Sequence, residues 1–269
     1  MLDDVVHLCP LPATTKKVVE LADSDRASIA AIVQAISGDP ALATAVLRVA
    51  NSALYAGMKV SQLDAAVIRI GLRELKDLAS AMSVLSAFRS KDPVQTTLQD
   101  RSVLAGAIAN KLAKVTKLMP PSTASTCGLL CEIGAMACLA VDGKVYSKIW
   151  VETASDFALR VAKETERYAV TSFEIGRRFL ERNSLPDEVS SVVGAELGAD
   201  SSTLTVPQKV CLAARHSAAI LVAFGATDES ATIGSLEGLM LQLDFAQLDG
   251  KGLYELLLRE GLMRDLGRR

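Results

Sequence analysis

One long stretch with a single charged residue constrains this chain more than any other feature. Residues 122–141 consist of apolar and small side chains apart from Glu132. A helix that is uncharged around its whole circumference is typical of a position surrounded by other helices. We therefore expect residues 122–141 to form one helix at the centre of a helical unit.

The rest of the composition favours helices over sheets. Half of the 269 residues are hydrophobic, with Ala, Leu and Val prominent, and only 4% are aromatic. Ala and Leu have high helix propensity, whereas strands favour β-branched and aromatic residues. Apolar residues at helical spacing predict helices that include residues 29–36, 94–118 and 206–224, and we find no strand pattern. We expect an all-α protein of one large or two small domains.

Several residues mark the expected helix boundaries. Ser28 is the expected N-cap of the helix over residues 29–36, and Gly38 its left-handed stop. Asp39 and Pro40 then restart the chain as a new helix, because proline at a first helical position has no amide to leave unpaired. The polar segment 89–93 closes this first part of the chain.

The charge balance and the cysteines bear on partners and compartment. With 29 basic and 31 acidic residues the net charge is -2, which removes the usual driving force for binding nucleic acid. The chain starts with acidic residues where a secretory signal is basic, and no apolar run approaches the roughly 18 residues of a membrane helix. Three of the five cysteines lie close together in one stretch of the sequence, whereas the cysteines of a disulfide framework are spread along the chain. We expect a cytoplasmic protein with no membrane and no nucleic-acid partner.

Four short motifs carry a resemblance to a known family. They are Leu11-Pro12, Asp39-Pro40-Ala41-Leu42, residues 47–55 (LRVANSALY) and residues 66–72 (AVIRIGL). On these motifs the chain resembles the HDOD family, the HD-related output domain, over residues 11–199. In the second half the resemblance rests on the order of the helices, on Glu174-Ile175-Gly176 and on Leu185-Pro186.

The resemblance implies a fold related to the HD-type metal-dependent phosphohydrolases, in a bacterial family associated with signal transduction. We accordingly expect an N-terminal helical subdomain over residues 10–90, packed on an HD-like helical bundle over residues 94–200. Residues 205–269 match nothing in the family and are expected to form a helical C-terminal tail.

The resemblance also assigns this chain the positions of a degenerate metal site. HD-type hydrolysis needs a divalent metal held by several His and Asp side chains, including an adjacent His-Asp pair. Cys131 stands in the His place of that pair and Glu132 in the Asp place, while Arg101 and Ser172 occupy the other two His positions. The whole chain has only two histidines. A guanidinium has no lone pair to give a metal and its charge repels one, so we expect no metal and no other cofactor.

Glu132 is the most informative of these residues, because a buried carboxylate is costly unless another group pairs with it. We expect Arg101 to be that partner, with their ion pair filling the space of the metal; the alternative is that Glu132 reaches solvent. Cys127 and Cys131 lie one helical turn apart and could hold a soft metal with a third ligand, but small buried thiols more often serve packing. For His216 we expect a satisfied or an exposed side chain without a catalytic role.

The residues of the family motifs are expected to act mainly in the structure. Asn51 and Ser52 sit near a helix end, where both side chains can bond free backbone groups or the following loop. The full set of such motif positions is Asp39, Pro40, Asn51, Ser52, Tyr55 and Gly71.

These observations predict a non-catalytic regulatory protein that binds a protein partner in a signalling pathway or a small signal. A divergent phosphohydrolase is the alternative, and it would need carboxylates such as Glu132 and Glu174 to hold a metal almost without histidine. A binding module for a nucleotide messenger is a third reading. The Ala-rich helical surface is also suited to self-association.

Overall fold

The computed structural model divides into two compact units, His7–Arg89 and Ser90–Arg269, the second including Met1–Val6. The residues that the structure describes are 17–18, 21, 28–38, 40–51, 55, 58–72, 75, 88, 91–153, 156–183, 185–198, 201–224, 228–260 and 262–263. Every regular element in these ranges is a helix, which confirms the all-α fold class.

Three helices of the first unit are described: α3 (Ile29–Ser37), α4 (Pro40–Ala50) and α5 (Leu63–Ile70). Ser28 caps α3 as predicted, since its hydroxyl accepts a hydrogen bond from the Ala31 amide at 3.1 Å. The expectation for Gly38 is wrong, because its φ of -70° is right-handed. Its amide bonds carbonyls at the end of α3, which closes the helix without a left-handed residue.

Asn51 and Arg69 tie the end of α4 to the segment that follows it. The Asn51 amide group donates to the Val60 carbonyl at 2.8 Å and accepts from the Val60 amide at 2.7 Å. Arg69 on α5 donates to the carbonyls of Ala50 and Met58. Asn51 therefore satisfies free backbone groups, as the sequence predicted.

The structure describes three of the other motif positions. Pro40 begins α4, and Gly71 ends α5 with a φ of +86°, a conformation that favours glycine. Tyr55 is half-buried, whereas Asp39 and Ser52 lie outside the described residues.

The second unit is built on α7 (Pro93–Thr116), with Asp92 capping its N-terminus and Pro93 at its first position. The helices that follow are α8 (Pro121–Leu130), α9 (Ile133–Val141), α10 (Gly143–Thr153), α11 (Phe157–Tyr168), α12 (Ser172–Arg182), α13 (Asp187–Val193), α14 (Val206–Phe224), α15 (Glu229–Gln242) and α16 (Gly250–Arg259).

The central stretch is buried, but it is not one helix. The chain turns at Cys131 and Glu132, between α8 and α9, so the expectation of a single helix over residues 122–141 is wrong. At the turn the Cys131 amide bonds the Gly128 carbonyl, three residues back, and the α-helical pattern breaks. Taken together, Pro121–Val141 is long and apolar enough to cross a membrane, contrary to the sequence-based expectation, yet most of it is buried inside the protein.

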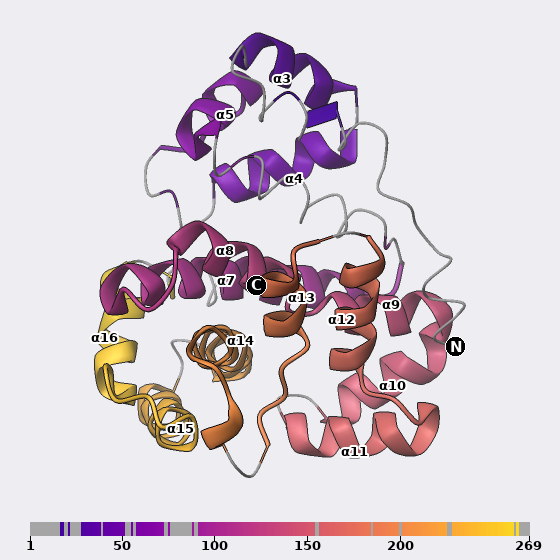
Figure 1. Cartoon of the computed structure of the whole chain (residues 1–269), viewed down its shortest axis with the longest axis vertical. Helices are drawn as coiled ribbons and strands as arrows, with labels where there is room; N and C mark the ends of the chain where they lie inside the picture. The colour runs from indigo at the N-terminus through magenta and orange to yellow at the C-terminus, as the bar shows by residue number, and fades with distance from the viewer. Residues whose placement is uncertain are drawn as a thin grey trace. The chain divides into compact units, whose positions relative to one another are not determined.

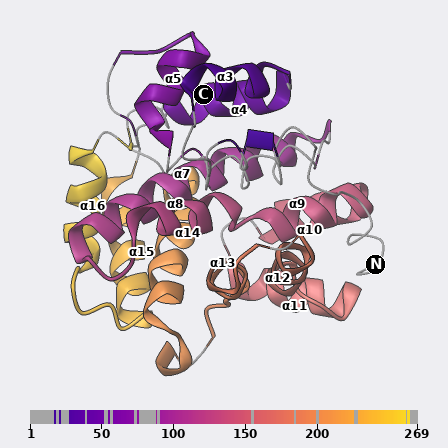
Figure 2. The same cartoon turned by 45° about the horizontal axis from the view of Figure 1, so that its top comes forward.

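α14 packs against α7, α8 and α15, and α15 packs against α16 (Figure 1). The helices of residues 205–269 thus belong to the same compact unit as residues 94–200. In the turned view α12 and α13 lie side by side (Figure 2), and α12 also packs on α9. α14 therefore reaches the core of the unit from a part of the chain outside the family motifs.

The crossing of α9 and α12 depends on the absence of a side chain at Gly134. A Cβ atom there would lie 1.7 Å from the Ser172 carbonyl oxygen and 2.7 Å from the Gly176 nitrogen. Both of these are backbone atoms, so the two helices would have to move apart.

We predict that Gly134→Ala lowers the free energy of unfolding by at least about 3 kcal/mol, because overpacking against backbone cannot be relieved by a rotamer change. Gly238→Ala in α15 is the matched control, since a Cβ atom there meets nothing within 4 Å, and it should stabilise the helix by up to about 1 kcal/mol. Urea unfolding of both variants measures this. Equal stability of Gly134→Ala and wild type would contradict the close crossing.

Candidate functional site

The carboxylate of Glu132 lies at the break between α8 and α9, and its side chain has no exposed surface. Two guanidinium groups from different helices hold it. Arg101 Nη2, on α7, lies 2.9 Å from Glu132 Oε1, and Arg215 Nη2, on α14, donates to Oε2 at 2.9 Å. Glu132 is therefore shared between two buried arginines and does not reach solvent.

Aromatic rings cover the flat faces of these guanidinium groups. Arg215 lies 4.0 Å above the ring of Phe173, and Arg101 lies 4.8 Å above that of Trp150. A third buried arginine, Arg160 on α11, lies 3.8 Å above the same indole ring. Cation–π contacts of this kind stabilise a desolvated cation, and for each of these arginines they replace part of its lost hydration.

A second buried carboxylate, Glu164 on α11, anchors the neighbouring elements. It accepts a hydrogen bond from the Tyr146 hydroxyl at 2.7 Å and another from the Ser172 amide at 2.6 Å. Burial raises the pKa of Glu164, and these two donors oppose the shift. Arg160 on the same helix donates through Nε to the Thr153 hydroxyl at 3.3 Å. Glu164 thus joins α10, α11 and α12.

The charges around Glu132 keep it ionised. Burial alone would raise its pKa, but Arg101, Arg215 and Arg160 outweigh that cost and lower the pKa of Glu132 to about 2. Burial lowers the pKa of Arg101 to about 10 against the opposing effect of Glu132, so this guanidinium stays protonated at neutral pH. Glu132 and Arg101 are therefore both charged at neutral pH, although both are buried.

His216 sits beside this cluster as a neutral ring. It stacks on Phe157 with the ring centroids 3.9 Å apart and an angle of 25° between the planes. Burial lowers the pKa of His216 to about 3, and the charges of Arg215 and Arg101 act in the same direction. The ring fills space in an apolar cluster and is buried, so the exposed side chain that the sequence left open as an alternative is wrong.

The residues around Glu132 do not fit a divalent metal. Metal binding needs several lone-pair donors that converge on one point, whereas the groups that meet Glu132 are guanidinium cations. Burial raises the pKa of Cys127 to about 12 and raises that of Cys131, which disfavours the thiolate that a metal would need. Across the described ranges, no group of three His, Cys, Asp or Glu side chains comes together.

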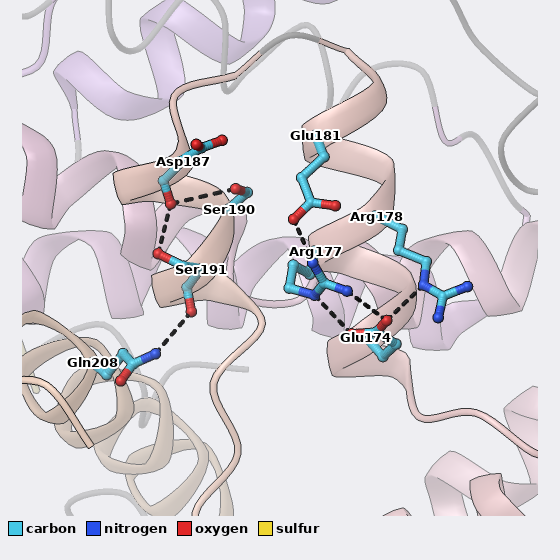
Figure 3. Close-up of polar contacts among 8 residues, drawn as sticks. All are labelled: Glu174, Arg177, Arg178, Glu181, Asp187, Ser190, Ser191 and Gln208. Atoms are coloured by element: carbon cyan, nitrogen blue, oxygen red, sulfur yellow. Dashed lines mark hydrogen bonds and ion pairs between the residues drawn. The ribbon is translucent and has the colours of Figure 1, made fainter. Parts of the chain in front are cut away.

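Glu174, the other carboxylate considered as a ligand, is also held by arginines (Figure 3). It accepts hydrogen bonds from Arg177 Nε and Nη2 at 2.7 Å each and from Arg178 Nε at 2.5 Å. The hydrogen bonds from Arg177 contribute most and those from Arg178 contribute less, and together they lower the pKa of Glu174 to about 2. Figure 3 also shows Gln208 at the start of α14, which donates to the Ser191 carbonyl of α13 at 3.1 Å.

The structure brings together three of the four positions that the resemblance assigned. Arg101 contacts Glu132 as expected, and Cys131 adjoins it in the chain, while Ser172 binds Glu164 through its amide. Sequence reasoning missed Arg215, because it lies 83 residues away from Glu132 in what was expected to be a separate tail. The available signal was Arg215 in the apolar middle of the helix over residues 206–224, where Lys209 near its start is the one other cation; residues 122–141 carry a single carboxylate.

Comparison with known proteins identifies the family of the chain. The family model of the HDOD domain matches residues 8–196. An uncharacterised protein of Treponema pallidum (strain Nichols) is 28% identical over 197 residues, which is 71% of this chain and 37% of that protein. The chain therefore spans well under half the length of this curated relative.

Solved structures share the fold. A crystal structure of a provisionally named phosphohydrolase from Shewanella amazonensis SB2B has a TM-score of 0.73 and 23% identity, and covers 99% of this chain and 97% of that one. An HDOD domain protein of unknown function from Geobacter sulfurreducens gives a TM-score of 0.68 and 18% identity, with 97% and 93% covered. A provisionally named signal transduction protein from Marinobacter aquaeolei VT8 gives 0.63 and 24%, with 99% and 60% covered.

We predict that Glu132→Gln lowers the free energy of unfolding by about 3–5 kcal/mol, because it leaves buried arginines without their counter-charge. Arg101→Met should cost less, since Glu132 keeps Arg215. The double variant should lose less than the sum of the two single losses. Chemical denaturation of the three variants measures the coupling.

The matched control is Glu174→Gln, whose carboxylate pairs with two arginines at the surface and should cost about 1 kcal/mol or less. Strict additivity of Arg101→Met and Glu132→Gln would contradict the buried ion pair.

The titration of His216 predicts how the free energy of unfolding depends on pH. Its pKa in the folded state is about 3, below the unfolded value of about 6.5, so protonation favours the unfolded chain. The full contribution of this residue to stability is present above about pH 7 and is lost as the pH falls toward 3. The difference in unfolding free energy between wild type and His216→Gln should therefore shrink by about 1 kcal/mol per pH unit between about pH 6 and 4. Parallel stability curves for the two proteins would count against a buried neutral imidazole.

Proposed function

Because the chain belongs to the HDOD domain family, we propose that it is a regulatory protein of signal transduction that acts by binding and without catalysis. It would bind a protein partner or a small signal through the helical unit that contains Glu132. Self-association through its Ala-rich helical surface is compatible with this role. The solved relative named as a signal transduction protein lends support at the level of the fold.

One observation carries the proposal: the carboxylate at the expected metal position is held by two guanidinium groups, each 2.9 Å away. A metal ion at this carboxylate would have to displace both cations or lie against them. Moving a guanidinium out of its aromatic contacts into a buried site without a partner costs several kcal/mol. The arrangement therefore favours a scaffold in which an ion-pair cluster performs the structural part of a metal centre.

The competing function is a divergent phosphohydrolase, which the provisional names of two solved relatives from Shewanella amazonensis SB2B suggest. It would require Glu132 and Glu174 to hold a metal. Both carboxylates already accept hydrogen bonds from arginines, and Glu174 does so at the surface of α12. This chemistry argues for binding over hydrolysis.

A phosphodiesterase assay in added manganese, paired with elemental analysis of the purified protein, tests the proposal. We expect no turnover of bis(4-nitrophenyl) phosphate above the buffer rate and no stoichiometric metal. The control is Glu174→Gln, which removes one of the two required ligands at the surface and should leave the fold intact. Metal-dependent turnover in wild type that falls in Glu174→Gln would replace the proposal with the hydrolase.

A further inference from the structure

We propose that the unit containing Glu132 binds a medium-chain aliphatic monocarboxylate in a pocket walled by Arg101, Trp150 and Val222. The proposal rests on the function proposed above and names the small signal. The pocket has a volume of about 350 Å³ and lies between α7, α10 and α14. This is near the lower end of the range of about 300–1,000 Å³ found for small-molecule sites.

The side chains that line the pocket indicate that most of the ligand is apolar. Most of it is aliphatic, with Val94 from α7, Val151 from α10, and Ala219 and Val222 from α14. Trp150 also lines it, but Arg160 at 3.8 Å and Arg101 at 4.8 Å already stand over its ring. An aliphatic chain fits these surfaces better than a flat ring that needs an aromatic face for stacking.

The polar part of the wall fixes the charge of the ligand. Arg101 is 3% exposed and Thr97 is the other polar side chain of the pocket. While Arg101 Nη2 contacts Glu132, its Nε has no hydrogen-bond acceptor among the described residues. A buried guanidinium nitrogen without an acceptor is costly, and a carboxylate can supply the acceptor with full charge assistance.

The charge of the pocket lining points to a single negative charge on the ligand. Arg101 is the one charged side chain among the residues that line the pocket. One guanidinium matches one carboxylate. A nucleotide messenger needs several cations for its phosphates and a free ring face for its base. The pocket offers one guanidinium and an indole that the arginines already cover.

Trp150 makes the binding observable, because it is the only tryptophan in the sequence. Titration of the full chain with octanoate, followed by tryptophan fluorescence and calorimetry, should give saturable binding with a stoichiometry of one. Octanamide, which has the same chain without the charge, should bind at least tenfold more weakly, and octylammonium should not bind. Equal affinity for the three compounds, or no saturable binding of octanoate, would overturn the proposal.

Two substitutions on the same helix locate the site without touching the ion pairs. Val222→Phe places a ring in the pocket from an exposed position and should weaken octanoate binding at least tenfold. Val206→Phe is the matched control, since Val206 is exposed to a similar degree on α14 but does not line the pocket. Undiminished binding by Val222→Phe would place the ligand elsewhere and reject this pocket.

The outcomes separate this proposal from the one on which it rests. Failure of octanoate to bind, in a protein without metal-dependent turnover, rejects the monocarboxylate and leaves a non-catalytic regulatory protein. Metal-dependent turnover rejects the regulatory proposal whatever octanoate does, and with it the assignment of the pocket to a signal.

Discussion

A carboxylate shared between two buried arginines is the constraint on which the second unit depends. Glu132 comes from the break between α8 and α9, Arg101 from α7 and Arg215 from α14, so the cluster joins three parts of the chain in the core. Loss of the carboxylate would leave the two cations without a counter-charge in an apolar interior, where uncompensated charge is expensive. Removal of the Glu132 carboxylate is therefore expected to lower the stability of the second unit.

On the proposed function, the cluster makes the connections between helices that a metal centre would make. A metal centre crosslinks helices through its coordination bonds, and a network of charge-assisted hydrogen bonds can make the same connections. The aromatic rings of Trp150 and Phe173 stabilise the guanidinium groups, while Glu164 fastens α11 to α10 and α12. Side chains of the described residues thus connect the helices of the interior through charge-assisted hydrogen bonds.

Local features of the fold were predictable from the sequence, whereas long-range features were not. The cap at Ser28 and the bounds of the helix over residues 206–224 follow from capping chemistry and helical spacing, which are read from neighbouring residues. The break at Glu132 was missed because no proline marks it, and Gly128 and Gly134 beside it do not by themselves end a helix. The arginines that pair with Glu132 come from other helices. Arg101 could be named because the resemblance marked its position, but Arg215 is brought in by tertiary packing across 83 residues.

The most direct test is X-ray diffraction from crystals of the full chain grown in millimolar manganese, with data collected at the manganese absorption edge. The account predicts no anomalous peak beside the Glu132 carboxylate, with Arg101 and Arg215 both in contact with it. A manganese peak at that carboxylate, with either guanidinium displaced, would contradict the claim that an ion-pair cluster has taken the place of the metal.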